Sequence, residues 1–295
     1  MPELKKYMGE AYLWQYVPSL AGSITFTVLF TLVSVSLGWK THRSKTRFCI
    51  PFLIGGICEI LGYIFRAAAW NATDSLPIYI MQALFLLLPP VFFAATLYMV
   101  YSRLVRAVGG ESCSWITVRW TTRLFVLGDF ITFNIQGNGG GLLANPDTVN
   151  IGNIIVIAGL IAQIILFLAF VACCVIFHRR FRIYLRHTSM PVGIRWEAYL
   201  NMLYFTSALI LVRNIFRVVE FAMDKKGYLQ QKEWPTFVFD SVLMLLVMIA
   251  FYIRYPDNLQ PYSRDSAVEL VPKPDSSSGQ VGPSSQMEYR HETSG

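Results

Sequence analysis

The sequence predicts an all-α, polytopic membrane protein: a seven-transmembrane helix bundle with its N-terminus outside and its C-terminus in the cytosol. Hydrophobic residues make up 54% of the 295 residues and charged residues 15%, which is far from the composition of an ordinary soluble domain. The apolar residues gather in runs of about 20, the length that a helix needs to cross a hydrocarbon core about 30 Å thick. Lys and Arg collect in alternate connections between these runs, as the positive-inside rule requires.

Each of the apolar runs is expected to form one span. The runs cover about 17–38, 48–70, 77–101, 122–143, 152–177, 197–222 and 235–254. All seven tryptophans lie at or just beyond an expected end, where amphipathic rings favour the headgroup layer: Trp14, Trp39, Trp70, Trp115, Trp120, Trp196 and Trp234. These positions support the boundaries independently of hydropathy.

The third and fourth runs contain residues that disturb a simple helix. Pro89-Pro90 removes backbone hydrogen bonds from 77–101, so we expect a kink or break there, which acts either as a hinge or as a fixed bend. The run 122–143 is weakly apolar, and its glycines at 137 and 139–141 are expected to let the chain turn at the outer surface. It is kept as a span because without it the basic connection after 152–177 would face outward.

Basic residues fix the expected orientation and the domain boundaries. The basic connections 39–47, 102–121 and 178–195 are placed in the cytosol, and 71–76 and 144–151, which have no Lys or Arg, outside. The lysines expected outside oppose this orientation but are outnumbered: Lys5, Lys6, Lys225, Lys226 and Lys232. Residues 1–16 then form a short extracellular segment and 17–255 the membrane domain. Residues 256–295, rich in Ser, Pro, Gly and charges, form a disordered cytosolic tail. Asn71, in Asn71-Ala72-Thr73, is a possible glycosylation site in an outer loop.

Charged and amide side chains inside the runs are the candidate functional residues. Each ionised group costs ~2.5–3.5 kcal/mol at mid-bilayer, so it usually pairs inside the bundle or lines a pathway. Those of one run recur at helical spacing and therefore share a helix face. They are Glu59 and Arg66 in 48–70, Asp129 and Gln136 in 122–143, Arg213, Arg217 and Glu220 in 197–222, and Asp240 in 235–254. Two interpretations stay open: a structural ion network, or a network that also borders a polar head group or proton path.

Several function classes have no support in the sequence. The net charge of +7 is mostly the orientation signal, so no nucleic-acid partner is expected. A phosphate-binding loop of the G-x-x-x-x-G-K-[ST] type is missing, and the histidines all lie in connections or the tail, so no metal site or other cofactor is expected. No nucleophile elbow occurs. We expect a protein that is not an enzyme.

Six short segments carry a resemblance to a known family. They are E-I-L-G-Y-I-F-R (59–66), A-A-T-L-Y-M (94–99), F-V-L-G-D-F-I-T-F-N-I-Q-G-N-G-G-G (125–141), A-G-L-I-A-Q (158–163), V-R-N-I-F-R-V-V-E (212–220) and E-W-P-T-F-V-F-D (233–240). In this order and spacing, the chain resembles the fungal lipid-translocating exporters, the RTA-like membrane proteins, from about residue 15 to 256. It departs from their usual pattern at Pro89, Phe237 and Tyr255.

The resemblance implies a seven-helix protein that moves, or confers resistance to, lipids and amphiphilic toxic compounds. Family members are associated with sphingoid long-chain bases, sterol analogues and porphyrins. We therefore expect a transporter or exporter, in the plasma membrane, whose partners are membrane lipids and an amphiphilic substrate. The substrate, the direction and energy source of transport, and the oligomeric state are left open.

The expected mechanism places the polar head group of the amphiphile among the charged residues of the spans, which we call the charged seam. The apolar tail of the amphiphile stays among apolar helices. Carboxylates receive a cationic amine, arginines hold those carboxylates apart or bind a phosphate, and Asp129 relays protons. The carboxylates are Glu59, Glu220 and Asp240, and the arginines are Arg66, Arg213 and Arg217. A seven-helix receptor of the G-protein-coupled type and a non-transporting regulator of lipid asymmetry are the alternatives. Tyr101-Ser102-Arg103 stands where such receptors carry D-R-Y, which speaks weakly against the first.

Overall fold

The structure is a computed structural model, and it describes residues 14, 16, 18–142, 148–186, 195–223, 233–257 and 259. The described residues form helices and their connections, with no strand among them. Most of the predicted segment 1–16 and of the predicted tail 256–295 lies outside the described residues. In chain order the elements are α1 (Leu20–Ser44), η1 (Arg47–Cys49), α2 (Ile50–Ala69), α3 (Leu76–Leu87), α4 (Pro89–Ala107), η2 (Glu111–Cys113), α5 (Val118–Leu142), α6 (Val149–Leu185), α7 (Trp196–Ala222), α9 (Trp234–Thr236), η3 (Phe237–Val242) and α10 (Leu243–Ile253).

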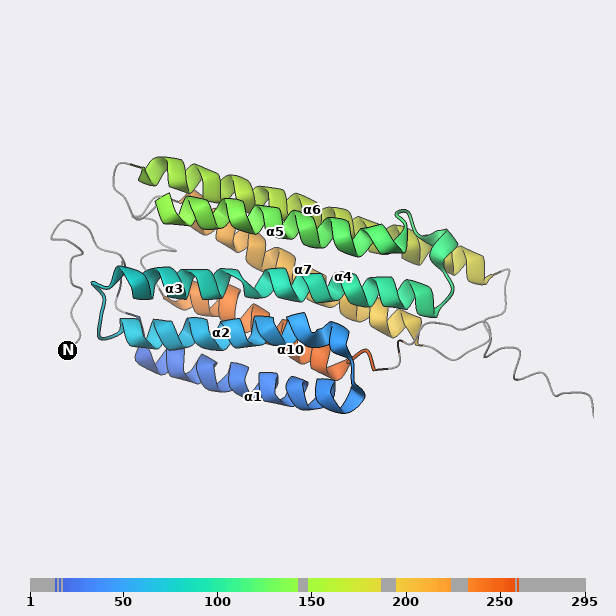
Figure 1. Ribbon diagram of the computed structural model, residues 1–295, viewed down its shortest axis with the longest axis horizontal. Helices are drawn as coiled ribbons and strands as arrows, with labels where there is room; N and C mark the ends of the chain where they lie inside the picture. Colours follow the sequence, from blue (N-terminus) through green and yellow to red (C-terminus); the bar gives the residue numbers. More distant parts are fainter. Residues whose placement is uncertain are drawn as a thin grey trace, which may run out of the picture. The chain divides into compact units, whose positions relative to one another are not determined.

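The long helices lie side by side along one direction, as Figure 1 shows. Among the described residues, six helical segments are long and apolar enough to cross a membrane: Leu20–Ser44, Arg47–Ala69, Leu76–Ala107, Val149–Leu185, Trp196–Ala222 and Trp234–Ile253. The predicted class, an all-α polytopic membrane protein, is confirmed. The 25-residue α5 packs between α4 and α6 but is less apolar, so its crossing stays a prediction, as does the orientation of the termini.

The glycines near the end of α5 do not turn the chain. The helix continues through them to Leu142, so that expectation was wrong. A Cβ at Gly139 would lie 2.9 Å from Val156 Cγ2 and 3.0 Å from the carbonyl oxygen of Gly152 on α6. Small residues at such a crossing let two helix backbones approach closely, as is common between membrane helices. At least one of these glycines therefore serves helix packing.

The paired prolines interrupt the third apolar run as predicted. Helix α3 ends at Leu87 and α4 begins at Pro89, while Leu88 between them keeps helical angles (φ −69°, ψ −40°). The two helices consequently follow each other nearly in line (Figure 1). Because Pro90 has no N–H, the carbonyl of Leu86 has no helical donor four residues later. That free carbonyl becomes part of the candidate site.

Aromatic side chains fill the centre of the bundle. The ring of Phe52 on α2 stacks on Phe93 of α4 at 4.4 Å and on Phe251 of α10 at 4.1 Å between centroids. Tyr98 on α4 meets Phe170 of α6 edge-on at 4.5 Å. Large apolar side chains are in contrast exposed along the outer faces, including Ile24, Val28, Leu32 and Val35 on α1 and Ile154, Ile161 and Ile165 on α6. An apolar outer surface of this extent is typical of helices that face lipid.

Candidate functional site

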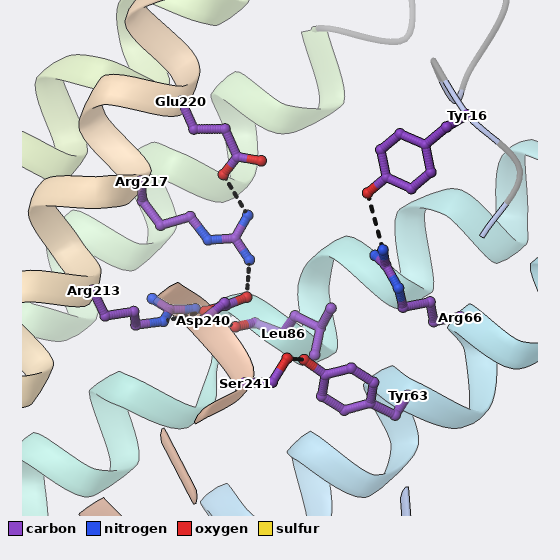
Figure 2. Close-up of polar contacts among 9 residues, drawn as sticks. All are labelled: Tyr16, Tyr63, Arg66, Leu86, Arg213, Arg217, Glu220, Asp240 and Ser241. Atoms are coloured by element: carbon purple, nitrogen blue, oxygen red, sulfur yellow. Dashed lines mark hydrogen bonds and ion pairs between the residues drawn. The ribbon is translucent and has the colours of Figure 1, made fainter. Parts of the chain in front are cut away.

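Two arginines of α7 and one aspartate of η3 form the centre of the candidate site (Figure 2). Arg213 Nε donates to Asp240 Oδ1 at 2.6 Å. Arg217 donates to Asp240 Oδ2 through Nη2 and to Glu220 Oε2 through Nη1, the latter at 3.0 Å. We call these four residues the arginine–aspartate cluster. Both Asp240 oxygens thus already accept from an arginine.

Local backbone irregularities hold this cluster in place. Asp240 lies in a π-helical turn, Phe237–Val242, a feature that often occurs at functional sites because it redirects a side chain. Arg213 Nη2 donates to the carbonyl of Leu86 at 2.7 Å, the carbonyl left without a helical partner by Pro90. Arg213 is 1% exposed, and these contacts use two of its five N–H donors. The proline break and the buried arginine are therefore one structural unit.

Glu59 of α2 lies beside the arginine–aspartate cluster without joining it. Its side chain is 2% exposed, and its carboxyl interacts electrostatically with Asp240, Arg213 and Arg217. Among the described residues, none forms a hydrogen bond or an ion pair with the Glu59 carboxyl. One helical turn further on, Tyr63 forms a hydrogen bond with Ser241, the neighbour of Asp240. The face of α2 that carries Glu59 thus packs directly against η3.

Arg66 of α2 has partners that the sequence did not indicate. Its Nη2 donates to Glu233 Oε1 at 2.8 Å and to the hydroxyl of Tyr16 at 2.9 Å. Both oxygens of Glu233 also accept from the backbone N–H of Ser19, at 2.9 and 3.0 Å, just before α1 begins. Arg66 therefore joins α2 to the start of α1 and to the residue preceding α9, and pairs with none of the three carboxylates expected to share the seam.

The two polar residues of α5 bind neighbours on α4 and α6. Asp129 Oδ2 accepts from the hydroxyl of Tyr98 at 2.8 Å, and its buried Oδ1 has no hydrogen-bond partner among the described residues. Gln136 Nε2 donates to Gln163 Oε1 of α6 at 2.8 Å. No described contact joins either residue to the arginine–aspartate cluster. The structure thus brings the charged residues of α7 and η3 together and places Glu59 beside them. Asp129 and Gln136 of α5 lie apart from this cluster.

The remaining predicted positions lie outside this network or at its edge. Asn71 is exposed just after α2, and Thr73 of the same acceptor sequence is 2% exposed. Pro89 and Pro90 are buried at the junction of α3 and α4. Within the described ranges, no group of three or more His, Cys, Asp or Glu side chains is arranged to hold a metal ion.

Comparison with known proteins identifies the family. The RTA1-like protein family matches residues 52–262. This chain is an RTA1-like protein. The match covers every residue of the arginine–aspartate cluster as well as Glu59, Arg66, Asp129 and Gln136, so the site lies wholly inside the family region.

Curated relatives of this RTA1-like protein come from Saccharomyces cerevisiae. Protoporphyrin uptake protein 1 is 33% identical over 279 residues, which cover 82% of this chain and 91% of the relative. Protein RTA1 is 32% identical over 270 residues, covering 83% and 84%. Sphingoid long-chain base transporter RSB1 is 24% identical over 277 residues, covering 81% and 72%. No solved structure matches the chain.

Sequence reasoning missed the partners of the predicted residues, although it had quoted the segments that contain them. Tyr98, Gln163 and Glu233 belong to the segments 94–99, 158–163 and 233–240, which had carried the family resemblance. Asn214, next to Arg213, is 1% exposed, and neither side-chain amide atom has a partner among the described residues. All four are polar residues inside segments that carry the family resemblance, and that was the signal that could have found them.

Proposed function

We propose that this RTA1-like protein is a multi-pass transporter that takes a single-chain amphiphile with a cationic amine, such as a sphingoid long-chain base, from the bilayer. The amine meets Glu59 beside the arginine–aspartate cluster, and the tail stays among apolar helices. In this proposal α5 crosses as the seventh span, the N-terminus lies outside, and the protein resides in the plasma membrane. The names of the relatives, a sphingoid long-chain base transporter and a protoporphyrin uptake protein, support transport of amphiphiles.

The observation that carries the proposal is the carboxyl of Glu59, which has no hydrogen-bond or ion-pair partner among the described residues. Arg213 and Arg217 supply two formal positive charges, whereas Glu59, Glu220 and Asp240 supply three negative ones, a difference of one negative charge. A buried carboxylate without a partner is costly, so Glu59 either carries a proton or binds a cation. A ligand amine provides the missing charge and gains a low-dielectric ion pair.

The other residues take supporting roles in this mechanism. Asp240 and Glu220 already form ion pairs with Arg213 and Arg217. We therefore assign the amine to Glu59 rather than to all three carboxylates. Arg66 and Glu233 tie α2 to the start of α1. Three further assignments rest on the sequence alone: a proton relay at Asp129, a hinge at Pro89-Pro90 and glycosylation at Asn71. Gln136 is proposed as a contact between α5 and α6 on the strength of its bond to Gln163.

Flux through the purified protein in liposomes tests this function. A fluorescent sphingoid base should cross faster in protein-containing vesicles than in empty ones, whereas its N-acetyl form, which has no cationic amine, should not. Glu59→Gln should reduce amine flux by at least tenfold, while Glu111→Gln, an exposed carboxyl near α5, should leave it unchanged. Flux should also respond to a proton gradient if Glu59 exchanges a proton for the amine.

The same measurement separates the two rival functions. A receptor would show ligand-dependent cytosolic signalling with no flux in liposomes. A regulator of lipid asymmetry would change lipid export in cells with no flux from the purified protein. Equal flux through wild type and Glu59→Gln would reject the assignment of the amine to Glu59.

A further inference from the structure

A cleft rich in arginine lies between the end of α4 and the beginning of α5, away from the arginine–aspartate cluster. Its volume is about 290 Å³, and Arg103 and Arg106 line it from α4 while Arg119 and Arg123 line it from α5. A second cavity of about 420 Å³ adjoins it and shares Arg119. We call the first cavity the basic cleft. Neither the family match nor the relatives assign a role to it.

The charges of the basic cleft are poorly compensated from within the chain. Arg106 pairs with Glu111 at 3.7 Å, and both side chains are largely exposed. None of the other three arginines forms an ion pair with a described residue. The arginines are spaced by three residues on α4 and by four on α5, so each pair shares a helix face, where like charges repel. An anion held between the two faces would relieve this repulsion.

The positive-inside rule explains basic residues at this end of the bundle but not their convergence. Arg179 and Arg180 at the end of α6 meet the same topological need, yet neither of them lines the cleft. Two lining residues of the cleft also join its two helices. Ser102 Oγ and Thr122 Oγ1 form a hydrogen bond of 2.7 Å across the two helices. Arg103 is held by the face of Phe48, with its guanidinium carbon 4.1 Å from the ring centroid.

Two exposed tryptophans beside the cleft are the basis for placing it at the level of the lipid head groups. Trp115 and Trp120 flank its α5 side and are 60% and 63% exposed, as expected for rings that lie in the headgroup layer. Guanidinium groups bind phosphate oxygens through paired N–H donors, and basic pockets between membrane helices bind anionic head groups. We propose that the basic cleft is a binding site for a phosphate group, provided by the head group of an anionic lipid or by a soluble phosphate.

Binding to the purified protein in detergent tests this site with three probes. These are a short-chain phosphatidylinositol bisphosphate, inorganic phosphate, and a short-chain phosphatidylcholine as the zwitterionic control. Wild type should bind the phosphoinositide saturably, and Arg119→Gln/Arg123→Gln should weaken binding at least tenfold. The matched variant Arg179→Gln/Arg180→Gln should retain wild-type affinity. Arg103→Gln/Arg106→Gln provides an independent removal from the α4 side if the first variant does not fold.

The outcomes decide both the site and the source of the phosphate. Tight phosphoinositide binding with weak binding of inorganic phosphate assigns the cleft to a lipid, whereas equal binding of both assigns it to a soluble phosphate. Equal losses in the cleft variants and the α6 variant would overturn the proposal, because they would indicate only general surface attraction. Absence of binding by both phosphate probes, or equal binding of phosphatidylcholine, would overturn it as well.

Discussion

The carboxylate of Asp240 forms ion pairs with two arginines that lie on one face of α7. The sequence predicted that charged residues would share helix faces, and Arg213 and Arg217, four residues apart, do reach the same carboxylate. Which carboxylate they would meet was not predictable, because that depends on the π-helical turn that places Asp240. Arg66 and its partner Glu233 are 167 positions apart, and only the tertiary fold brings them together.

Replacing Asp240 tests the importance of this ion network for stability. Asp240→Asn leaves the buried guanidinium of Arg213 and the partly buried one of Arg217 without their shared charge, and breaking a buried pair in this way costs about 3–5 kcal/mol. We expect a clearly lower unfolding temperature for the purified protein in detergent. Asp74→Asn, which changes an exposed aspartate, should unfold at the wild-type temperature. An unchanged unfolding temperature for Asp240→Asn would contradict the described network.

At the scale of elements, hydropathy predicted most helices well, but the expected turn at the glycines of α5 was wrong. Long apolar runs must form helices in lipid because every backbone group needs a partner, so their positions follow from composition. The glycines of α5 have a low intrinsic preference for helix, which suggested a turn, but the helix continues through them and Gly139 packs closely against α6. Such packing depends on a neighbour that local sequence does not specify.

Two neighbouring glycines of α5 provide a matched test of that packing. Gly139→Ala places a methyl group 3.0 Å from a backbone oxygen of α6, and overpacking of this kind costs about 1–3 kcal/mol. Gly140→Ala meets nothing within 4 Å and should gain up to about 1 kcal/mol from better helix propensity. Thermal unfolding should therefore shift in opposite directions for the two variants. A shift of the same sign and size in both would argue against a close α5–α6 crossing.

At the scale of the whole molecule, the topology depends on whether α5 crosses the bilayer. The described cysteines are all buried, so engineered cysteines give a low-background test. Ser112 and Asn150 are exposed and flank α5 and its connection to α6. With seven spans, Asn150→Cys should react with a membrane-impermeant maleimide on intact cells, and Ser112→Cys only after permeabilisation. Reaction of both from one side would show that α5 does not cross.

Equilibrium binding of a sphingoid base to the purified protein tests the central claim most directly, because it isolates recognition of the amine from movement. The account predicts that wild type binds the free base at least tenfold more tightly than its N-acetyl form. It also predicts that Glu59→Gln, with Glu111→Gln as the control, removes this preference. Retention of the preference in a folded Glu59→Gln variant would contradict the account.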